Sequence, residues 1–154
     1  MNFPRFSNLV RSFSSAALAL CLLAAGAQAG TSILVDAGTG KVLTEENSLQ
    51  RWYPASLTKL MTAYVAFKGL KSDGLTLTSP VRISANAAKQ PPSRMGYKPG
   101  QVLTLDNALK IMLVKSANDI AVAVAETAAG KNYQKARNEE ARRRGMTGSN
   151  WTNA

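Results

Sequence analysis

The pattern of apolar residues changes from strand-like to helix-like after the first third of the chain. Residues 32–36 form a short apolar run typical of a buried strand, and the apolar pattern resumes at 41–44 after a glycine-containing turn. These two segments predict a β-hairpin. Beyond Pro54, apolar residues recur three and four positions apart, which predicts a helix over about 56–67 that closes at Gly69.

The second half of the chain alternates between turn-rich and helical stretches. Glycines and prolines punctuate residues 71–103 and predict turns joined by short strands, at 75–77, 81–84 and 101–103. Apolar periodicity and capping residues then predict three helices: one capped by Thr104 that runs to about Val114 before Ser116 and Ala117 interrupt it, one over 120–129 ended by Gly130, and a basic one over 133–144 ended by Gly145. Strands followed by a cluster of helices predict an α+β fold.

The first 29 residues have the pattern of a secretory signal peptide. Arg5 and Arg11 precede a short apolar stretch over 15–25, and Ala27-Gln28-Ala29 is a small-x-small cleavage site. We therefore expect residues 1–29 to be removed and the mature chain to begin at Gly30. The alternative is a retained N-terminal anchor, although the apolar stretch is short for spanning a bilayer.

Composition excludes several kinds of chemistry. The chain has no histidine, and its one cysteine, Cys21, lies in the expected signal peptide. The mature protein would therefore form no disulfide, use no thiolate and bind no metal through cysteine. A hydrolase with this composition must activate its nucleophile without the usual histidine base, and we expect neither a metal nor a cofactor.

Charge gives a weaker indication of partners. Two of the 19 Lys and Arg residues lie in the expected signal peptide, so 17 basic residues face 9 acidic ones in the mature chain, a net charge of +8. Several cations fall within 131–144. We favour the solvated face of a helix as their explanation; the alternative is attraction to an anionic membrane, wall polymer or nucleic acid, of which export argues against nucleic acid.

Ser56 and Lys59 form the first candidate for chemistry. They lie three residues apart at the start of a predicted helix, so their side chains share one face. A lysine whose pKa falls below its usual value of about 10.4 can take the proton of a serine hydroxyl. Spacing alone also fits a helix-capping serine followed by a solvated lysine, but apolar neighbours favour burial of Lys59.

Ser116 and Asn118 form the second candidate. They fall at a junction between two apolar helices, where polar side chains stand out. Functionally, Ser116 would relay a proton and Asn118 would hold a substrate amide. The alternative is that one of them caps the free N–H groups of the following helix.

Five segments carry a family resemblance. In chain order they are residues 32–43, Pro54 to Thr62, Met95 to Gly100, Val114 to Asp119 and Arg144 to Ser149. Together they closely resemble the serine-type D-alanyl-D-alanine carboxypeptidases, the low-molecular-mass penicillin-binding proteins, and the resemblance covers residues 31–154. The Ser-x-x-Lys nucleophile motif belongs to the wider penicilloyl-serine group.

This resemblance implies an α+β fold of the penicillin-binding-protein and serine β-lactamase type. It implies Ser56 as acyl nucleophile, with its backbone N–H in the oxyanion hole, Lys59 as general base, Ser116 as proton relay and Asn118 as a substrate-binding residue. The substrates would be peptidoglycan stem peptides ending in D-Ala-D-Ala, with β-lactams as inhibitors. Such a protein would lie in the periplasm or on the outer face of the cytoplasmic membrane.

One family motif is missing from these residues. The family binds the substrate carboxylate with a Lys-Thr-Gly strand well downstream, and no Lys-Ser/Thr-Gly occurs here. We therefore expect residues 30–154 to be the N-terminal part of the catalytic domain, in a truncated fold with part of the antiparallel sheet. Two alternatives stay open: a non-catalytic envelope protein that binds peptidoglycan or a partner through its basic face, and a serine β-lactamase-type relative.

Overall fold

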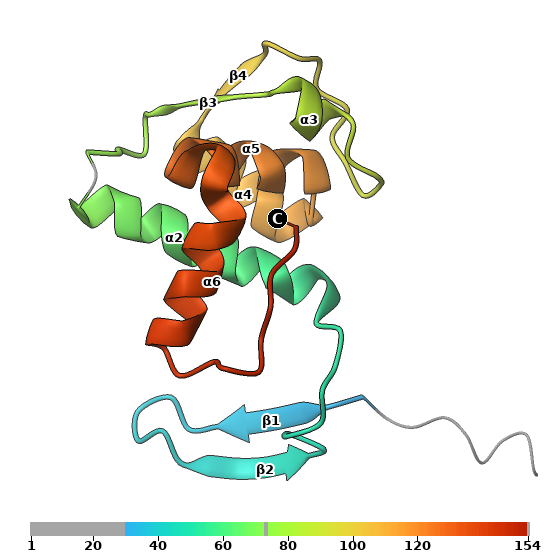
Figure 1. Cartoon of the computed structure of the whole chain (residues 1–154), viewed down its shortest axis with the longest axis vertical. Helices are drawn as coiled ribbons and strands as arrows, with labels where there is room; N and C mark the ends of the chain where they lie inside the picture. Colours follow the sequence, from blue (N-terminus) through green and yellow to red (C-terminus); the bar gives the residue numbers. More distant parts are fainter. Residues whose placement is uncertain (1–29, 73, 154) are drawn as a thin grey trace, which may run out of the picture. The chain divides into compact units, whose positions relative to one another are not determined.

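The computed structural model describes residues 30–72 and 74–153, which belong to two units that meet in sequence after Trp52. The predicted signal peptide lies outside the described residues. The first unit is a β-hairpin, and the second contains all of the described helices (Figure 1). Among the described residues, no helix combines the length and apolarity needed to cross a bilayer.

The hairpin unit pairs β1 (Ser32–Val35) with β2 (Val42–Glu46) in antiparallel register. Asp36 organises the turn, because its Oδ1 accepts hydrogen bonds from the Gly38 and Thr39 N–H groups and from the Thr39 hydroxyl, at 2.6–3.1 Å. The Thr39 hydroxyl bond, and then the Thr39 N–H bond, lower the pKa of the Asp36 carboxyl. Gly40 completes the turn with a φ of +72°, which suits glycine.

The hairpin was predicted correctly, but its burial was not. Residues 32–36 have the apolar run of a buried strand, yet every residue of β1 and β2 is exposed. A two-stranded ribbon cannot bury its own side chains, because each face needs a second layer to pack against it.

The helical unit is built around α5 (Asn118–Ala129), whose apolar residues Ile120, Val122 and Val124 are almost completely buried. α2 (Thr58–Ser72) and α4 (Leu105–Lys115) pack against it. α6 (Tyr133–Arg143) lies against both α2 and α5 (Figure 1). The core is therefore helix on helix, with α5 at its centre.

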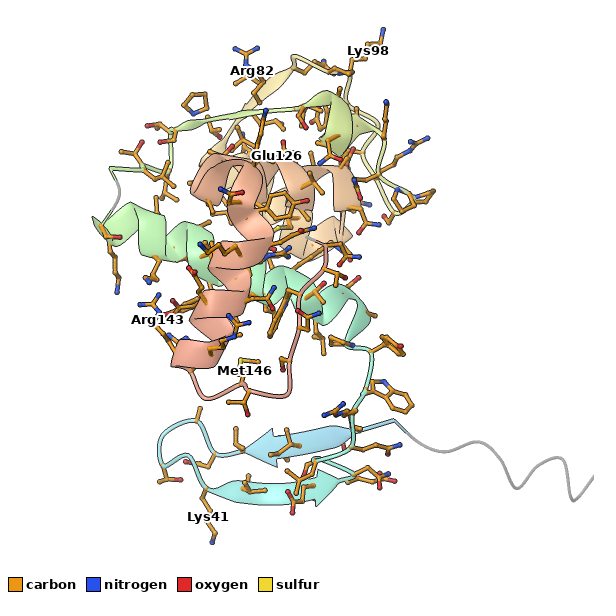
Figure 2. The ribbon with its side chains drawn as sticks, viewed as in Figure 1. Lys41, Arg82, Lys98, Glu126, Arg143 and Met146 are labelled. Carbon is orange, nitrogen blue, oxygen red and sulfur yellow. The ribbon has the colours of Figure 1, made fainter. Side chains whose placement is uncertain are left out.

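A small sheet and a short helix cover another side of α5. β3 (Pro80–Arg82) pairs antiparallel with β4 (Val102–Thr104), and α3 (Ala85–Ala88) follows β3. Val81 and Ile83 in this layer are buried and belong to the hydrophobic core. The amide of Asn86 donates to Glu126 Oε1 of α5 at 2.9 Å, while Lys98 projects outward (Figure 2).

The structure differs from four local expectations. Residues 75–77 form no strand and lead into a turn at 77–78, and α3 was not expected at all. Gly69 does not end the first long helix: it is buried inside α2, and the chain leaves the helical direction near Gly74, whose φ is +74°. The predicted helix start at Ser56 is instead a single 3-10 turn over Ala55–Leu57, and α2 follows from Thr58.

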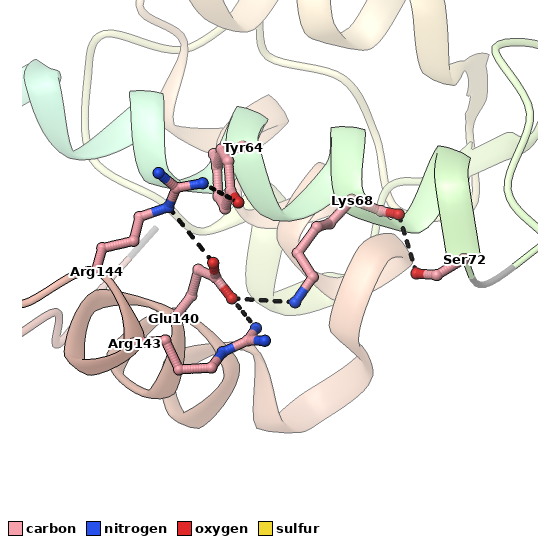
Figure 3. Close-up of polar contacts among 6 residues, drawn as sticks. All are labelled: Tyr64, Lys68, Ser72, Glu140, Arg143 and Arg144. Atoms are coloured by element: carbon pink, nitrogen blue, oxygen red, sulfur yellow. Dashed lines mark hydrogen bonds and ion pairs between the residues drawn. The ribbon is translucent and has the colours of Figure 1, made fainter.

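The basic helix α6 is held to α2 through charge (Figure 3). The Glu140 carboxylate is nearly buried and accepts from Lys68 of α2 at 3.0 Å, while Arg143 and Arg144 of its own helix also pair with it. The Arg144 guanidinium in turn lies over the Tyr64 ring, 4.0 Å from its centre. Most cations of the basic stretch are nevertheless exposed, as expected for a solvated helix face, although Arg143 and Arg144 also pair with Glu140.

Arg137 is the clearest exception to a solvated basic face. It is 1% exposed, donates to the Thr62 hydroxyl at 3.3 Å and lies 5.1 Å from the centre of the Tyr133 ring. Its Nε and Nη2 have no hydrogen-bond partner among the described residues. Burial lowers the pKa of Arg137 to about 10, and the neighbouring Tyr133 opposes this shift.

Candidate active site

Ser56 lies in the 3-10 turn that introduces α2. Ala55 adopts a φ of +48°, the Leu57 N–H donates to the Pro54 carbonyl at 3.0 Å, and the Thr58 hydroxyl donates to the Ala55 carbonyl at 2.9 Å. These local bonds fix the turn and leave Ser56 exposed. A reactive hydroxyl at this position is open to a substrate.

The Ser56 hydroxyl meets Ser116 across the fold. Ser116 Oγ donates to Ser56 Oγ at 2.6 Å, although the two residues are 60 positions apart in sequence. Because Ser56 Oγ accepts this bond, its own hydrogen remains available for transfer to a base. The contact joins the start of α2 to the end of α4.

Lys59 is the second residue of α2 and is 5% exposed. Its ammonium nitrogen donates to Asn118 Oδ1 at 2.7 Å. Burial lowers the pKa of Lys59 below its ordinary value, because a charged amine is less stable away from water. No ion pair found among the described residues neutralises this lysine.

The junction between α4 and α5 aims Ser116 and Asn118 at this pair. Ser116 ends α4 in the left-handed conformation, with a φ of +55°, and Asn118 is the first residue of α5. The N-cap position of α5 is Ala117, with no side-chain cap. The alternative that Ser116 or Asn118 serves as the cap of α5 is therefore wrong, because their side chains contact Ser56 and Lys59 instead.

Asn118 has a defined amide orientation. Its Nδ2 donates to the carbonyls of Pro91 and Pro92, at 3.0 and 3.3 Å. Carbonyl oxygens only accept hydrogen bonds, so the NH2 end of the amide must face them and the oxygen must face Lys59. The 91–96 loop, which was not among the candidate site residues, thus forms a wall of the site.

Asp119 was also missed. In the sequence it was only the last residue of the motif segment Val114 to Asp119, yet it is 0% exposed and accepts backbone hydrogen bonds from Met95 and Gly96. The signal that could have found it is the polar run 116–119 at the head of an otherwise apolar helix.

The arrangement is suited to nucleophilic catalysis without a metal. A serine hydroxyl, a buried lysine, a second serine and an oriented amide come together from η2 (Ala55–Leu57), α2 and the α4–α5 junction. Within the part of the chain that the structure describes, no cluster of three or more His, Cys, Asp or Glu side chains could hold a metal ion. The geometry provides a nucleophile, a candidate base and a candidate proton relay.

A separate groove does not overlap this cluster. It lies between α2, α5 and α6, with a volume of about 630 Å³, and Val65, Ala129 and Arg143 are among its lining residues. None of Ser56, Lys59, Ser116 and Asn118 lines it. The candidate site therefore lies at the N-terminal end of α2, away from this groove.

Comparison with known proteins gives a consistent result. The family model of D-alanyl-D-alanine carboxypeptidases matches residues 12–154. A D-alanyl-D-alanine carboxypeptidase of Bacillus subtilis, DacF, is 33% identical over 128 residues, which cover 82% of this chain and 33% of that protein. DacC of Escherichia coli, another D-alanyl-D-alanine carboxypeptidase, is 38% identical over 104 residues, which cover 64% of this chain and 26% of that protein.

Solved structures show the same fold. The D-alanyl-D-alanine carboxypeptidase DacD from Francisella tularensis is similar with a TM-score of 0.76 and 33% identity, over 82% of this chain and 31% of that chain. Penicillin binding protein 5 from Haemophilus influenzae gives 0.72 and 33%, over 80% and 37%. The α+β penicillin-binding-protein fold is confirmed, and the chain spans about a quarter to a third of the length of the curated relatives.

Proposed function

Because this chain belongs to the D-alanyl-D-alanine carboxypeptidase family, we propose that it provides the nucleophile side of a serine carboxypeptidase that removes the terminal D-alanine from peptidoglycan stem peptides. One observation carries the proposal: the Ser56–Ser116 contact of 2.6 Å lies beside the buried Lys59–Asn118 contact of 2.7 Å. Two residue pairs from distant parts of the sequence are thereby assembled into one reactive cluster.

The first half of the reaction forms an acyl-enzyme. Ser56 Oγ attacks the carbonyl carbon of the penultimate D-alanine while neutral Lys59 takes the hydroxyl proton. The backbone N–H of Ser56 stabilises the oxyanion at the start of the helix, where the dipole is positive. The tetrahedral intermediate then collapses and the peptide C–N bond breaks. Ser116 gives its proton to the departing amine of D-alanine and takes up the proton that Lys59 holds, which leaves Lys59 neutral and Ser116 protonated again.

The second half releases the shortened peptide. A water molecule attacks the carbonyl carbon of the Ser56 ester and gives a proton to Lys59, the basic group of the cluster. The C–O bond to Ser56 then breaks, and this proton passes to Ser56 Oγ, which restores the hydroxyl. Asn118 holds the substrate amide during both halves. Burial of Lys59 supports its role, because the lowered pKa increases the fraction of neutral amine that can accept a proton.

β-Lactams would react with the same serine, since their strained amide resembles the D-Ala-D-Ala peptide bond. Family membership further supports an exported protein. We place it in the periplasm or on the outer face of the cytoplasmic membrane. The net charge of +8 in the mature chain supports attraction to an anionic membrane surface, which should weaken as salt concentration rises.

The test is intact mass after incubation with a penicillin. The protein is expressed from its full 154-residue sequence, purified after export, and compared with Ser56→Ala and with Ser48→Ala, which changes a half-buried serine of the hairpin unit that donates to Glu45. We expect one penicilloyl adduct that Ser48→Ala keeps and Ser56→Ala loses. A folded sample without an adduct contradicts the proposal and favours a non-catalytic envelope protein. An adduct that is hydrolysed rapidly, so that the free protein is recovered, would identify the chain as a β-lactamase-type relative instead.

A further inference from the structure

We propose that Asp119 is a positioning residue of the Ser56 site: its buried carboxylate anchors the 91–96 loop, and that loop fixes which end of the Asn118 amide faces Lys59. The inference rests on the proposed function for its catalytic consequence. The structural part of it stands on hydrogen bonds that can be measured without any reaction.

The Asp119 carboxylate is completely buried and is held by three backbone donors. Its Oδ2 accepts from the N–H groups of Met95 at 3.0 Å and Gly96 at 2.9 Å, and its Oδ1 from the N–H of Ile120 at 2.9 Å. Hydrogen bonds to an ionised carboxylate are about twice as strong as neutral ones. Gly96 adopts a φ of +81°, so the loop bends sharply where the carboxylate captures it.

The other end of the same loop contacts the catalytic junction. The Asn118 N–H donates to the Ser93 carbonyl at 2.7 Å, and the Ser93 hydroxyl donates to the Lys115 carbonyl at 3.3 Å. The carbonyls of Pro91 and Pro92 receive the Asn118 side-chain NH2. The loop is therefore pinned between the Asn118 amide at one end and the Asp119 carboxylate at the other.

This geometry connects Asp119 to Lys59 in two steps. An asparagine amide has one donating end and one accepting end, and the proline carbonyls can satisfy only the donating end. With the loop in place, Asn118 Oδ1 must face the Lys59 ammonium, as the 2.7 Å contact shows. A released loop would allow the amide to rotate and present its NH2 group to the Lys59 nitrogen, where two donors would meet.

The test uses Asp119→Asn, with Asp106→Asn as a matched control. Asparagine keeps the shape but removes the charge and one accepting oxygen, while Asp106 is a partly exposed residue of α4 that pairs with Lys110. Backbone amide exchange at Met95 and Gly96 is measured by NMR, together with the side-chain amide signal of Asn118 and the rate of penicilloylation.

We expect the Met95 and Gly96 amides to be protected in the wild-type protein and to exchange at least tenfold faster in Asp119→Asn. The Asn118 side-chain signal should shift and the acylation rate should fall about tenfold or more. Asp106→Asn should change none of these. Altered stability alone would not move the Asn118 signal under conditions where the fold is intact.

The outcomes separate this inference from the proposed function. If the wild-type protein is not acylated, the proposed function fails, while amide exchange still decides the role of Asp119. Wild-type Met95 and Gly96 amides that exchange as fast as an unstructured peptide would overturn the inference, even if Asp119→Asn does not fold. Normal acylation by Asp119→Asn with an unchanged Asn118 signal would overturn it as well.

Discussion

At the scale of single residues, Lys59 is the group whose chemistry depends most on its surroundings. It is 5% exposed, and its one hydrogen bond in the described residues is to a neutral amide. Lost hydration therefore raises the free energy of the ammonium form, and no carboxylate among the described residues pairs with it to offset this cost.

The burial of Lys59 predicts the pH dependence of acylation. Because burial lowers the Lys59 pKa, the neutral base should become available below the usual lysine pKa of about 10.4. The rate of penicilloylation should rise with pH and reach its plateau with a midpoint below that value. A midpoint at or above the pKa of a solvated lysine would show that another group takes the proton.

Lys59→Arg gives a second prediction at this scale. A guanidinium stays protonated near neutral pH, so it can fill the position but cannot act as the base there. We expect acylation to fall about 100-fold or more, while circular dichroism remains that of the folded protein. Lys110→Arg, in an exposed ion pair, should acylate at the wild-type rate.

The sequence predicted which residues come together but not how they pair. Spacing placed Ser56 with Lys59 and Ser116 with Asn118, because neighbours within a helical turn are a local property. The structure pairs Ser56 with Ser116 and Lys59 with Asn118 across about 60 residues. Such pairing depends on the packing of α2 against α5, which no local pattern encodes.

At the scale of elements, Glu140 provides the ion pair that joins α6 to α2 among the described residues (Figure 3). Glu140→Gln would leave Lys68, Arg143 and Arg144 close together without their shared carboxylate. We expect the free energy of unfolding in urea to fall by roughly 1–3 kcal/mol. Glu139→Gln is the matched control, because Glu139 forms only an exposed pair with Lys135 and should change stability by less than about 0.5 kcal/mol. Equal effects of the two substitutions would contradict the role assigned to Glu140.

Arg137 gives the opposite prediction on the same helix. Two of its guanidinium nitrogens have no partner in the described part of the chain, and the lowered pKa of about 10 shows that burial disfavours the charge. Arg137→Met replaces it with an unbranched apolar side chain and should leave the free energy of unfolding unchanged or higher, by up to about 2 kcal/mol. A marked loss would mean that the Thr62 and Tyr133 contacts outweigh the burial cost. The wild-type cost should also shrink above about pH 10, as the folded form gives up its proton first.

Element boundaries were predictable where a local signal sets them. Thr104 caps α4 by accepting from the Asn107 N–H, and Gly130 and Gly145 lie just beyond α5 and α6, as expected. Gly69 is also a glycine that predicts the end of a helix, but it is buried inside α2, so tertiary packing overrides this local signal. The four residues of α3 are too short for any period to show, and only the Ser84 cap marks its start.

At the scale of the whole molecule, the described residues supply a helical core with two separate two-stranded sheets. The family and the α+β fold were predictable because five motif segments retain their order. The exposure of β1 and β2 was not, since an apolar run indicates that burial is favourable without saying what covers it.

The segment after α6 returns along that helix and is fastened to it. The Asn138 side chain accepts from the Trp151 N–H at 2.9 Å and donates to the Trp151 carbonyl at 2.8 Å, as a neighbouring strand would. The indole N–H of Trp151 is buried with no acceptor among the described residues. Trp52, the other tryptophan, is about half exposed.

An indole that is shielded from water fluoresces at shorter wavelength than one in water. Trp151 is half-buried with its indole N–H shielded, so it should emit at shorter wavelength than the more exposed Trp52, and Trp52→Phe should leave a spectrum that reports on the attachment of Trp151 to α6. Release of the return segment from α6 would move that emission to the red before the helical core melts. The fluorescence of Trp151 thus reports how firmly the residues that follow α6 are attached to that helix.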